Sequence, residues 1–344
     1  MTILVTGGAG YIGSHMVWSL LDSGEQVVVL DRLSTGFKWA LAPEARLYEG
    51  DIADLILLDT IFKSHQIDAI IHFAGSVVVP DSVSDPLSYY ENNTAKSRAL
   101  IAAAIEAGVP HFVFSSTAAV YGTPHDSRPV VESSALNPES PYGWSKLMTE
   151  VMLRDTAAAA PLTYTALRYF NVAGSDPKRR TGQSTAGATH LIKVACETAL
   201  GKRSRLSVYG TDYPTADGTC VRDYIHVSDL TSAHLKALQR MRAGGGSIVA
   251  NCGYGRGFSV LDVIDCVKRV SGHDFEVDFV DRRPGDAASV IANAAVARSE
   301  FGWVPEYDDL DLIVRTALAW EDHLSKRNHR QGLPSSSSGS PASG

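Results

Sequence analysis

The sequence contains few cysteines, no concentrated positive charge and no long apolar run. Its four cysteines stand far apart without metal-ligand spacing, which argues against a metal site or a disulfide framework built on them. The net charge is −7 and no basic cluster occurs, so we expect no nucleic-acid partner. No apolar stretch approaches the roughly 20 residues that span a bilayer, and the first residues lack the layout of a signal peptide. We therefore expect a cytoplasmic protein with free thiols and without a metal or a membrane partner.

What the sequence does contain, near its start, is a strand, a glycine-rich turn and a helix in succession. The strand-like residues 2–5 lead into Thr6-Gly7-Gly8-Ala9-Gly10-Tyr11-Ile12-Gly13, and a helical pattern runs from Ser14 to Leu21. Glycines in such a turn let backbone N–H groups approach a pyrophosphate at the helix N-terminus. Ordinary turns show the same pattern, so the interpretation needs a second indication.

An acidic residue at the end of the next strand gives that indication. Residues 27–30 are apolar and Asp31 follows them, where a carboxylate accepts hydrogen bonds from the ribose hydroxyls of NAD. The same carboxylate would repel the 2′-phosphate of NADP, although the neighbouring Arg32 acts in the opposite direction. Turn and acid together predict an NAD site.

Apolar strands and helical stretches continue to alternate through the first half of the chain. We expect strands at residues 47–50, 69–73 and 111–114 and a helix from about 86 to 107. Apolar strands separated by helices predict a doubly wound α/β fold, with a mainly parallel, Rossmann-like sheet covered on both faces. Ligands of such sheets bind at the carboxyl ends of the strands, and these ends carry Gly7, Asp31, Asp51, Ala74 and Thr117.

A tyrosine and a lysine stand four residues apart in Ser140-Pro141-Tyr142-Gly143-Trp144-Ser145-Lys146. Proline is well suited to the first helical position, and a spacing of four places Tyr142 and Lys146 on one helix face. A lysine beside a phenol favours phenolate, so Tyr142 is a candidate base with a lowered pKa. An exposed helix face can carry such a pair without any function. The strand-end hydroxyl of Thr117 completes the set that carbonyl/alcohol redox chemistry requires, so we predict these three residues to be catalytic.

These features resemble the extended short-chain dehydrogenase/reductase family and, more closely, its UDP-glucose 4-epimerase branch. The resemblance extends from Thr2 to about Leu324 and is most specific between Gly210 and Val227. The other matching stretches are Asp51-Ile52, Phe73-Ala74-Gly75, Tyr89-Tyr90-Glu91-Asn92-Asn93, Ala119-Val120-Tyr121-Gly122, Arg168-Tyr169-Phe170-Asn171 and Arg282-Arg283-Pro284-Gly285-Asp286. The resemblance implies reversible C4 epimerisation of UDP-galactose and UDP-glucose through a 4-keto intermediate, with tightly bound NAD, as in galactose metabolism.

The resemblance also implies which residues bind the two ligands. Those expected at the cofactor are Gly7, Gly10, Tyr11, Ile12, Gly13, Asp31, Asp51, Ile52, Phe73, Ala74, Gly75, Asn92, Ser115, Tyr142, Lys146 and Phe170. Those expected at the UDP-hexose are Thr117, Asn171, His190, Leu191, Leu206, Tyr209, Arg222, Arg283, Asp286 and Val290. Among these, Arg222 and Arg283 would hold the diphosphate, Asp286 the uridine ribose and Tyr209 the uracil. Loop arginines also often form surface salt bridges, and this is the alternative interpretation of Arg222 and Arg283.

The chain departs from the family pattern at four positions. Thr117 replaces the usual serine, so its extra methyl group must fit beside the sugar. Val77 stands where the family often has a lysine for the cofactor phosphates, which removes one charge-assisted contact of about 1.5–3 kcal/mol. His190 replaces a frequent asparagine, and Val290 falls where strict glucose/galactose enzymes carry a bulky tyrosine. We infer that the smaller Val290 admits N-acetylhexosamines.

The alternating rhythm ends after Asn171, and no clean linker follows. We expect an NAD-binding domain at residues 1–172, with returning elements at about 228–255, and a mainly UDP-sugar-binding domain at 173–330. A strand at 248–250 should rejoin the main sheet, and Ser259 should cap a helix over 260–271. Residues 331–344 lack core-forming side chains, which predicts a disordered tail.

Other functions remain open at the level of sequence. Nucleotide-sugar 4,6-dehydratases and decarboxylases are the nearest alternatives, but they often have acidic residues after the strand-end hydroxyl, whereas Ala118-Ala119 follow Thr117 here. A non-catalytic NAD-binding scaffold is a further alternative, which the intact hydroxyl, tyrosine and lysine disfavour. The family resemblance also implies a homodimer built on the helices near residues 92–107 and 141–158.

Overall fold

The computed structural model describes residues 1–124, 126, 128–283 and 286–330. Its centre is a sheet of seven parallel strands, and the expected α/β fold class is confirmed. In spatial order the strands are β10 (Ile248–Cys252), β6 (Thr163–Tyr169), β5 (His111–Ser115), β4 (Ile67–His72), β1 (Thr2–Thr6), β2 (Gln26–Asp31) and β3 (Arg46–Glu49). The expected return of residues 248–250 to this sheet is confirmed, because β10 pairs with β6 at its edge.

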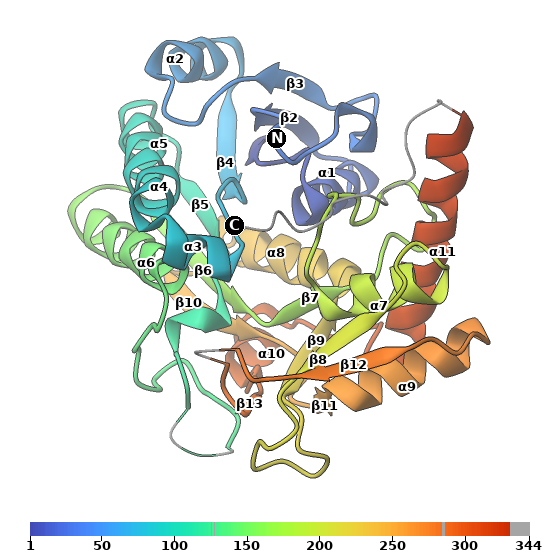
Figure 1. Ribbon diagram of the computed structural model, residues 1–344. Coiled ribbons are helices and arrows are strands. Elements are labelled where there is room, and N and C mark those ends of the chain that lie inside the picture. Colours follow the sequence, from blue (N-terminus) through green and yellow to red (C-terminus); the bar gives the residue numbers. More distant parts are fainter. Residues whose placement is uncertain (125, 127, 284–285, 331–344) are drawn as a thin grey trace.

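Both faces of the sheet are buried, which explains why its strands are apolar along their length. Ile3 and Val5 belong to one hydrophobic cluster, whereas Leu4 between them belongs to the other. Successive side chains of a strand point to opposite faces, so each face needs its own layer of helices. Figure 1 shows α1 (Tyr11–Asp22) and α8 (Val227–Arg242) on one side, and α2 (Leu55–Ser64), α5 (Lys96–Glu106) and α6 (Pro141–Ala159) on the other.

The helix boundaries follow local sequence features. Ser140 caps α6 by accepting a hydrogen bond from the Gly143 N–H at 3.2 Å, and Pro141 occupies the first helical position. Ser259 forms a capping box with Asp262 at the start of α9 (Val260–Ser271), as predicted. The expected helix from about 86 to 107 contains a π-helical turn, η2 (Tyr90–Ala95), between α4 (Pro86–Tyr89) and α5. Such turns are frequent at functional sites.

The second half of the chain builds a smaller layer beside the carboxyl edge of the sheet. Here β9 (Val221–His226) pairs with β7 (Asn171–Ala173), β11 (Gly257–Ser259) and β13 (Ser289–Val290), while β8 (Leu206–Tyr209) pairs with β12 (Val277–Val280).

The remaining elements are α3 (Val79–Ser84), α7 (Leu191–Ala199), α10 (Ala295–Phe301), α11 (Leu310–Arg330) and the short η1 (Lys38–Ala40) and η3 (Ala118–Val120). The predicted tail, 331–344, lies outside the described residues.

Candidate active site

The glycine-rich turn leaves no room for side chains. Gly7 has a φ of +69°, and a Cβ atom there would lie 2.6 Å from the backbone nitrogen of Ala74. A Cβ atom on Gly13 would lie 2.1 Å from the carbonyl oxygen of Gly7. The turn therefore packs as bare backbone at the start of α1, where N–H groups of the first helical turn are available to an anion. This cradle fits the pyrophosphate of a dinucleotide.

Asp31 stands at the end of β2 and holds the turn in place. Its Oδ2 accepts a hydrogen bond from the Ala9 N–H at 2.9 Å, and its Oδ1 accepts one from the Leu33 N–H at 2.7 Å. Each carboxylate oxygen has a second lone pair, so the predicted contact with a ribose remains sterically and chemically compatible.

Asp51 has partners that the sequence analysis missed. Burial alone would raise the pKa of this carboxyl. Hydrogen bonds from Lys96 and the Ala53 N–H, together with the charges of Lys96 and Arg32, outweigh burial, so the pKa is lowered overall. Lys96 begins α5, directly after the π-helical turn. Nothing in the sequence spacing links it to Asp51, because the contact joins elements that are distant along the chain.

Two predicted cofactor residues use their side chains within the protein. The Tyr11 hydroxyl donates to the Gly174 carbonyl at 2.7 Å, which leaves only its backbone for a phosphate. Asn92 donates from Nδ2 to the Ser76 hydroxyl at 2.9 Å. The neighbouring Asn93, which the sequence analysis did not select, is 2% exposed and donates to the hydroxyl of Ser145 at 3.0 Å. Asn93 thus joins the π-helical turn to the helix of the catalytic candidates.

The three catalytic candidates lie together, as their types and spacing predict. Tyr142 is 6% exposed and shares a hydrogen bond with Thr117. Thr117 lies between the end of β5 and the start of η3. Lys146 follows one turn later on the same face of α6 and donates from Nζ to the Ser115 carbonyl at 3.0 Å. The phenol of Tyr142 and the hydroxyl of Thr117 can therefore both hydrogen-bond to one substrate oxygen.

The protein's own groups do not lower the pKa of Tyr142. Burial raises it, the nearby Tyr169 and Tyr89 raise it further, and the hydrogen bond with Thr117 lowers it only partly. The prediction that Lys146 lowers the pKa of Tyr142 is therefore wrong when only the groups of the protein are considered. The Lys146 ammonium donates instead to the Ser115 carbonyl. Burial also lowers the pKa of Lys146 to about 8.

A buried ion pair supports this arrangement and was missed by the sequence analysis. Glu150 lies one turn beyond Lys146, accepts a hydrogen bond from the Ser116 hydroxyl and pairs with Arg168 at 2.6 Å. Both charged side chains are at most 5% exposed. Arg168 also donates to the Tyr121 hydroxyl at 3.1 Å. The spacing of four from Tyr142 to Lys146 to Glu150 was visible in the sequence and could have identified the third residue.

The predicted UDP residues form pairs with one another. Arg222 on β9 lies 3.6 Å from a carboxylate oxygen of Asp286 and donates to the Ala287 carbonyl at 2.8 Å. The Arg283 guanidinium lies 3.5 Å above the ring of Tyr209, at the end of β8. Cations and aromatic faces are thus assembled in one place, which suits a diphosphate next to a flat base.

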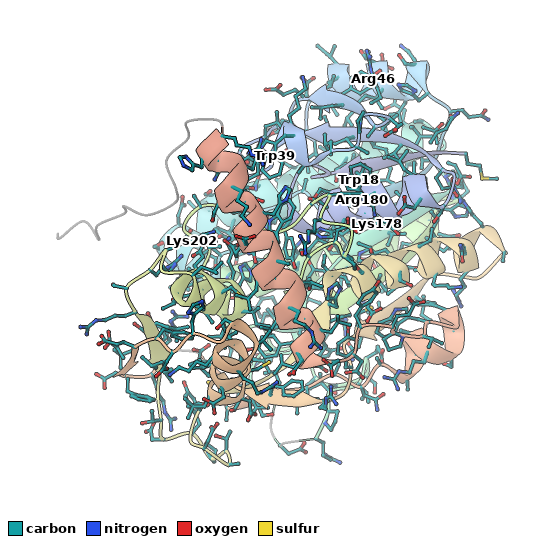
Figure 2. All side chains as sticks on the ribbon, turned by 90° about the vertical axis from the view of Figure 1, so that its right-hand side faces the viewer. Trp18, Trp39, Arg46, Lys178, Arg180 and Lys202 are labelled. Carbon is teal, nitrogen blue, oxygen red and sulfur yellow. The ribbon has the colours of Figure 1, made fainter. Side chains whose placement is uncertain are left out.

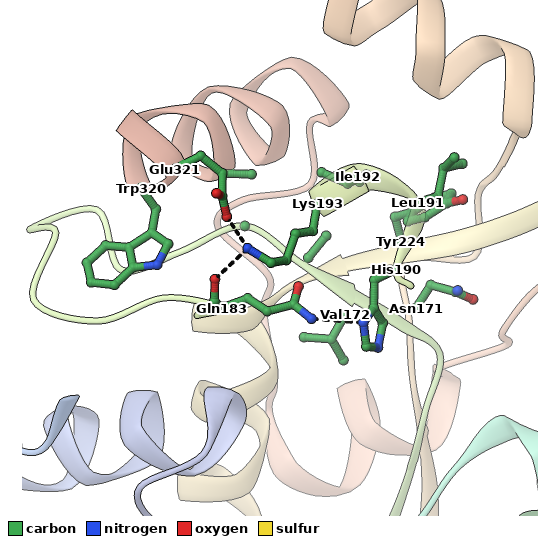
Figure 3. A pocket seen from close by; sticks show the side chains of 13 residues that line it. Asn171, Val172, Gln183, His190, Leu191, Ile192, Lys193, Tyr224, Trp320 and Glu321 are labelled. Atoms are coloured by element: carbon green, nitrogen blue, oxygen red, sulfur yellow. Dashed lines mark hydrogen bonds and ion pairs between the residues drawn. The ribbon is translucent and has the colours of Figure 1, made fainter. Parts of the chain in front are cut away.

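The predicted sugar-path residues border a small cavity of about 30 Å³. Figure 3 shows Asn171, His190 and Leu191 on this cavity, with Gln183 between His190 and Lys193. His190 precedes the first residue of α7, and its Nδ1 lies 2.8 Å from Nε2 of Gln183. Because the amide nitrogen can only donate, Nδ1 accepts and Nε2 carries the proton.

Other predicted residues take different positions around the site. Val290 pairs in register with Arg222 and packs on a cluster that includes Phe170 and Val120. Leu206 is 1% exposed within the main core, so only its backbone is available to a ligand. The described part of the chain contains no group of three side chains suited to a metal ion, and among the same residues no helix has the length and apolarity to cross a membrane.

The fold and the glycine-rich turn together define a class: a dinucleotide-binding enzyme of the dehydrogenase type. The chain belongs to the NAD dependent epimerase/dehydratase family, whose model matches residues 3–253. The expected resemblance at the family level is thereby confirmed.

Individual relatives match over nearly the whole chain. The UDP-glucose 4-epimerase of Azospirillum brasilense is 54% identical over 335 residues, which cover 97% of this chain and 96% of the relative. The structure of the UDP-glucose 4-epimerase from Brucella ovis in complex with NAD is 42% identical, with a TM-score of 0.89 over 92% of this chain and 97% of that one. The UDP-Glc/GlcNAc 4-epimerase from Campylobacter jejuni is 46% identical, with a TM-score of 0.82 over 94% and 99%.

Proposed function

We propose that this protein interconverts UDP-galactose and UDP-glucose by epimerising C4, with NAD held at the glycine-rich turn. The observation that carries the proposal is the contact of Tyr142 with Thr117 at the carboxyl edge of the main sheet. The pairing of cations with aromatic faces at Arg222, Arg283 and Tyr209 supports a UDP-linked substrate. The UDP-glucose 4-epimerases to which the chain is similar support the same reaction.

In the proposed mechanism the protein moves one proton and positions two ligands. NAD held at the glycine-rich turn would supply a hydride acceptor for C4 and a hydride donor for the return. Tyr142 takes the proton of the 4-hydroxyl as the hydride leaves, and Thr117 hydrogen-bonds the same oxygen. Lys146 would hold the cofactor ribose from its place one turn along α6. When the 4-ketose has turned its other face to the cofactor, Tyr142 gives the proton back.

The turning of the ketose explains where binding should be strong. Tight contacts to the sugar would prevent the rotation, whereas contacts to the nucleotide leave it free. Arg222 and Arg283 are therefore expected to hold the diphosphate, with Asp286 at the ribose and Tyr209 at the uracil. Guanidinium groups suit this role because they bind phosphate oxygens in a bidentate manner.

The surroundings of Thr117 favour epimerisation over dehydration. A 4,6-dehydratase needs a further acid or base to expel water, and Ala118 and Ala119 supply none. The carboxylate that contacts this segment is Glu150, which is held by Arg168 at 2.6 Å. Its two oxygens are already engaged by Arg168 and the Ser116 hydroxyl, which leaves Tyr142 to act alone.

The sugar scope depends on Val290. This side chain packs on the cluster that contains Phe170, and a valine leaves more room there than a tyrosine. We therefore include UDP-N-acetylhexosamines among the substrates. Similarity to the UDP-Glc/GlcNAc 4-epimerase from Campylobacter jejuni agrees with this scope.

A homodimer in the cytoplasm completes the proposal. The outer side of α6 and the turn before α5 border a groove of about 580 Å³, lined by Leu87, Tyr90, Glu91, Thr94, Ala95, Arg98, Met148 and Met152. Leu87 is 78% exposed and Met148 40% exposed. A two-fold axis would let a second copy cover this surface with the same surface. The four cysteines are free and buried, which suits a reducing compartment.

One assay tests the central proposal. The purified protein is incubated with UDP-galactose without added cofactor, and the products are identified. We expect UDP-glucose without a lasting rise in NADH absorbance. A 4-keto-6-deoxy sugar, a pentose or unchanged substrate would each reject epimerisation, and copurified NADP in place of NAD would reject the role of Asp31.

A further inference from the structure

The last helix contacts the segments that border the cofactor and the substrate. Trp320 of α11 is 2% exposed, and its indole stacks on that of Trp39 with a centroid distance of 6.2 Å and an interplanar angle of 22°. Two turns later on the same helix, the guanidinium of Arg327 lies 3.8 Å above the ring of Trp39. Figure 2 shows Trp39 beside this helix. Trp39 belongs to η1, a short distance after the NAD-ribose candidate Asp31.

The segment that carries Trp39 is fastened to the glycine-rich turn. The Phe37 N–H donates to the Ala9 carbonyl at 2.9 Å, and a Cβ atom on Gly36 would lie 2.7 Å from the same carbonyl carbon. The N–H of Ala9 in turn donates to Asp31. A displacement of Trp39 therefore reaches the backbone that would hold the cofactor.

On its other side Trp320 supports the loop that leads to His190. A Cβ atom on Gly182 would lie 2.4 Å from the indole, so backbone packs directly on the ring. The indole N–H donates to the Ser184 hydroxyl at 3.2 Å. Gln183, between these two residues, fixes the tautomer of His190. Figure 3 shows Trp320 on the cavity that Asn171 and His190 also border.

The helix that carries the indole is joined to α7 by ion pairs. Glu321, the next residue, is 2% exposed and forms ion pairs with Lys193 of α7 and, at 2.8 Å, with Lys202. Removing one partner of such a buried pair is strongly destabilising, so these ion pairs hold this part of α11 against α7. His190 immediately precedes that helix.

We propose that Trp320 is a positioning residue that couples UDP-sugar binding to retention of NAD. The inference rests on the proposed function. A nucleotide that orders the loop around His190 also orders the indole, and the indole then restrains Trp39 and the glycine-rich turn. Ordering that is shared between two ligands makes their binding cooperative, and by linkage each ligand strengthens the binding of the other by the same factor.

The test measures how fast NAD leaves the holoenzyme, with and without saturating UDP. In the unmodified protein we expect UDP to slow the loss about tenfold, within the usual 5–150-fold range of coupling between sites. In Trp320→Leu the two rates should agree within about twofold, and Trp320→Phe should restore much of the difference because a ring is kept. With NAD in excess, Trp320→Leu should raise the KM for UDP-galactose about tenfold and change kcat by less than about twofold.

Two further variants keep the test decisive. Trp39→Leu alters a partly buried side chain and should abolish the UDP effect even if Trp320→Leu fails to fold. His323→Ala is the matched control, since this exposed ring stacks on Trp320 at 5.2 Å from the same helix; it should keep the UDP effect. An equal UDP effect in Trp39→Leu and the unmodified protein, or no UDP effect in the unmodified protein, would overturn the inference. Absence of NAD or of UDP-galactose turnover in the unmodified protein would instead reject the proposed function.

Discussion

At the scale of single residues, the proposed base Tyr142 lies in a buried position. Burial and two neighbouring tyrosines raise its pKa, and Thr117 is the one group that acts against them among its described neighbours. A phenol that keeps its proton so firmly is a weak acid, whereas its phenolate is a strong base. In the return step the oxygen of the ketose becomes much more basic as the hydride arrives at C4, and this oxygen can then take the proton from Tyr142 despite the raised pKa.

Replacing Tyr142 by phenylalanine should test this role most directly. The ring and its packing remain, but the oxygen that carries the proton is lost, so we expect kcat to fall by at least about 100-fold. Bound NAD should remain, because the glycine-rich turn is untouched. The measurement is UDP-galactose turnover together with the NAD content of the purified variant. A rate near that of the unmodified protein would place the base elsewhere.

Replacing Val290 by tyrosine should narrow the choice of sugar. The larger ring would fill the space beside Phe170, so kcat/KM for UDP-GlcNAc should fall by about 10–200-fold, as for other steric discriminations. Turnover of UDP-galactose should change by less than about threefold. Val290→Ile, which adds one methylene, is the matched control. Activity with UDP-galactose alone in the unmodified protein, with no effect of the tyrosine, would contradict the proposed scope.

Residue-level prediction from the sequence succeeded where a short motif carries the geometry. Tyr142 and Lys146 share a helix face because their spacing requires it, and Thr117 joins them because strand ends meet at one edge of a parallel sheet. The contacts of Lys96 with Asp51 and of Arg168 with Glu150 were not predicted. They join residues that are far apart in sequence, and only the packed fold brings them together.

At the scale of elements, α6 has two faces with different tasks. Tyr142, Lys146 and Glu150 are buried along one face, while Trp144, Met148 and Val151 are 38–40% exposed along another. The exposed residues are spaced by four and three, which places them in one stripe. Together with the neighbouring groove, this stripe is the surface that we assign to a second copy.

A charge in this stripe should separate the proposed dimer. In Met148→Glu a carboxylate would be buried against its own copy across the two-fold axis, so the dissociation constant should rise by at least about 100-fold, equivalent to about 3 kcal/mol. Analytical ultracentrifugation over a range of concentrations measures it. Ile56→Glu, on the exposed start of α2, is the control and should leave assembly unchanged. A monomeric unmodified protein would refute the assignment.

Elements were predictable from sequence where local chemistry sets them. The proline after Ser140, the Ser259 cap and the apolar strands each act within a few residues, and the structure has these elements close to the expected bounds. The π-helical turn over Tyr90–Ala95 was not expected. No residue type marks such a turn, and here it accompanies the tertiary contact of Asn93 with Ser145.

At the scale of the whole molecule, four of the histidines that the structure describes are buried as neutral rings. Burial lowers the pKa of His72 and His226 to about 3, and of His15 and His234 to about 4. In the unfolded chain these groups titrate near ~6.5. Between these values the unfolded state binds more protons than the folded state, so stability is present above about pH 6.5 and is lost as the pH falls.

Acidification should therefore weaken the fold well before carboxylates are protonated. Four rings, each gaining a proton only on unfolding, should remove about 5 kcal/mol between pH 7.5 and 5.5, a large part of a typical total of 5–15 kcal/mol. Burial raises the pKa of Asp223 and Asp229, which acts in the opposite direction but involves half as many groups. The measurement is the denaturant midpoint at each pH with NAD in excess.

His234→Leu should reduce this pH dependence by about a quarter, because one of the four rings no longer titrates. This ring packs on Phe73 and its Nε2 has no hydrogen-bond partner, so an apolar side chain fits its surroundings. The exposed His273→Gln is the control and should leave the slope unchanged. Stability that is level or rising between pH 7.5 and 5.5 would show that the buried rings take up protons without unfolding, through water that reaches the core.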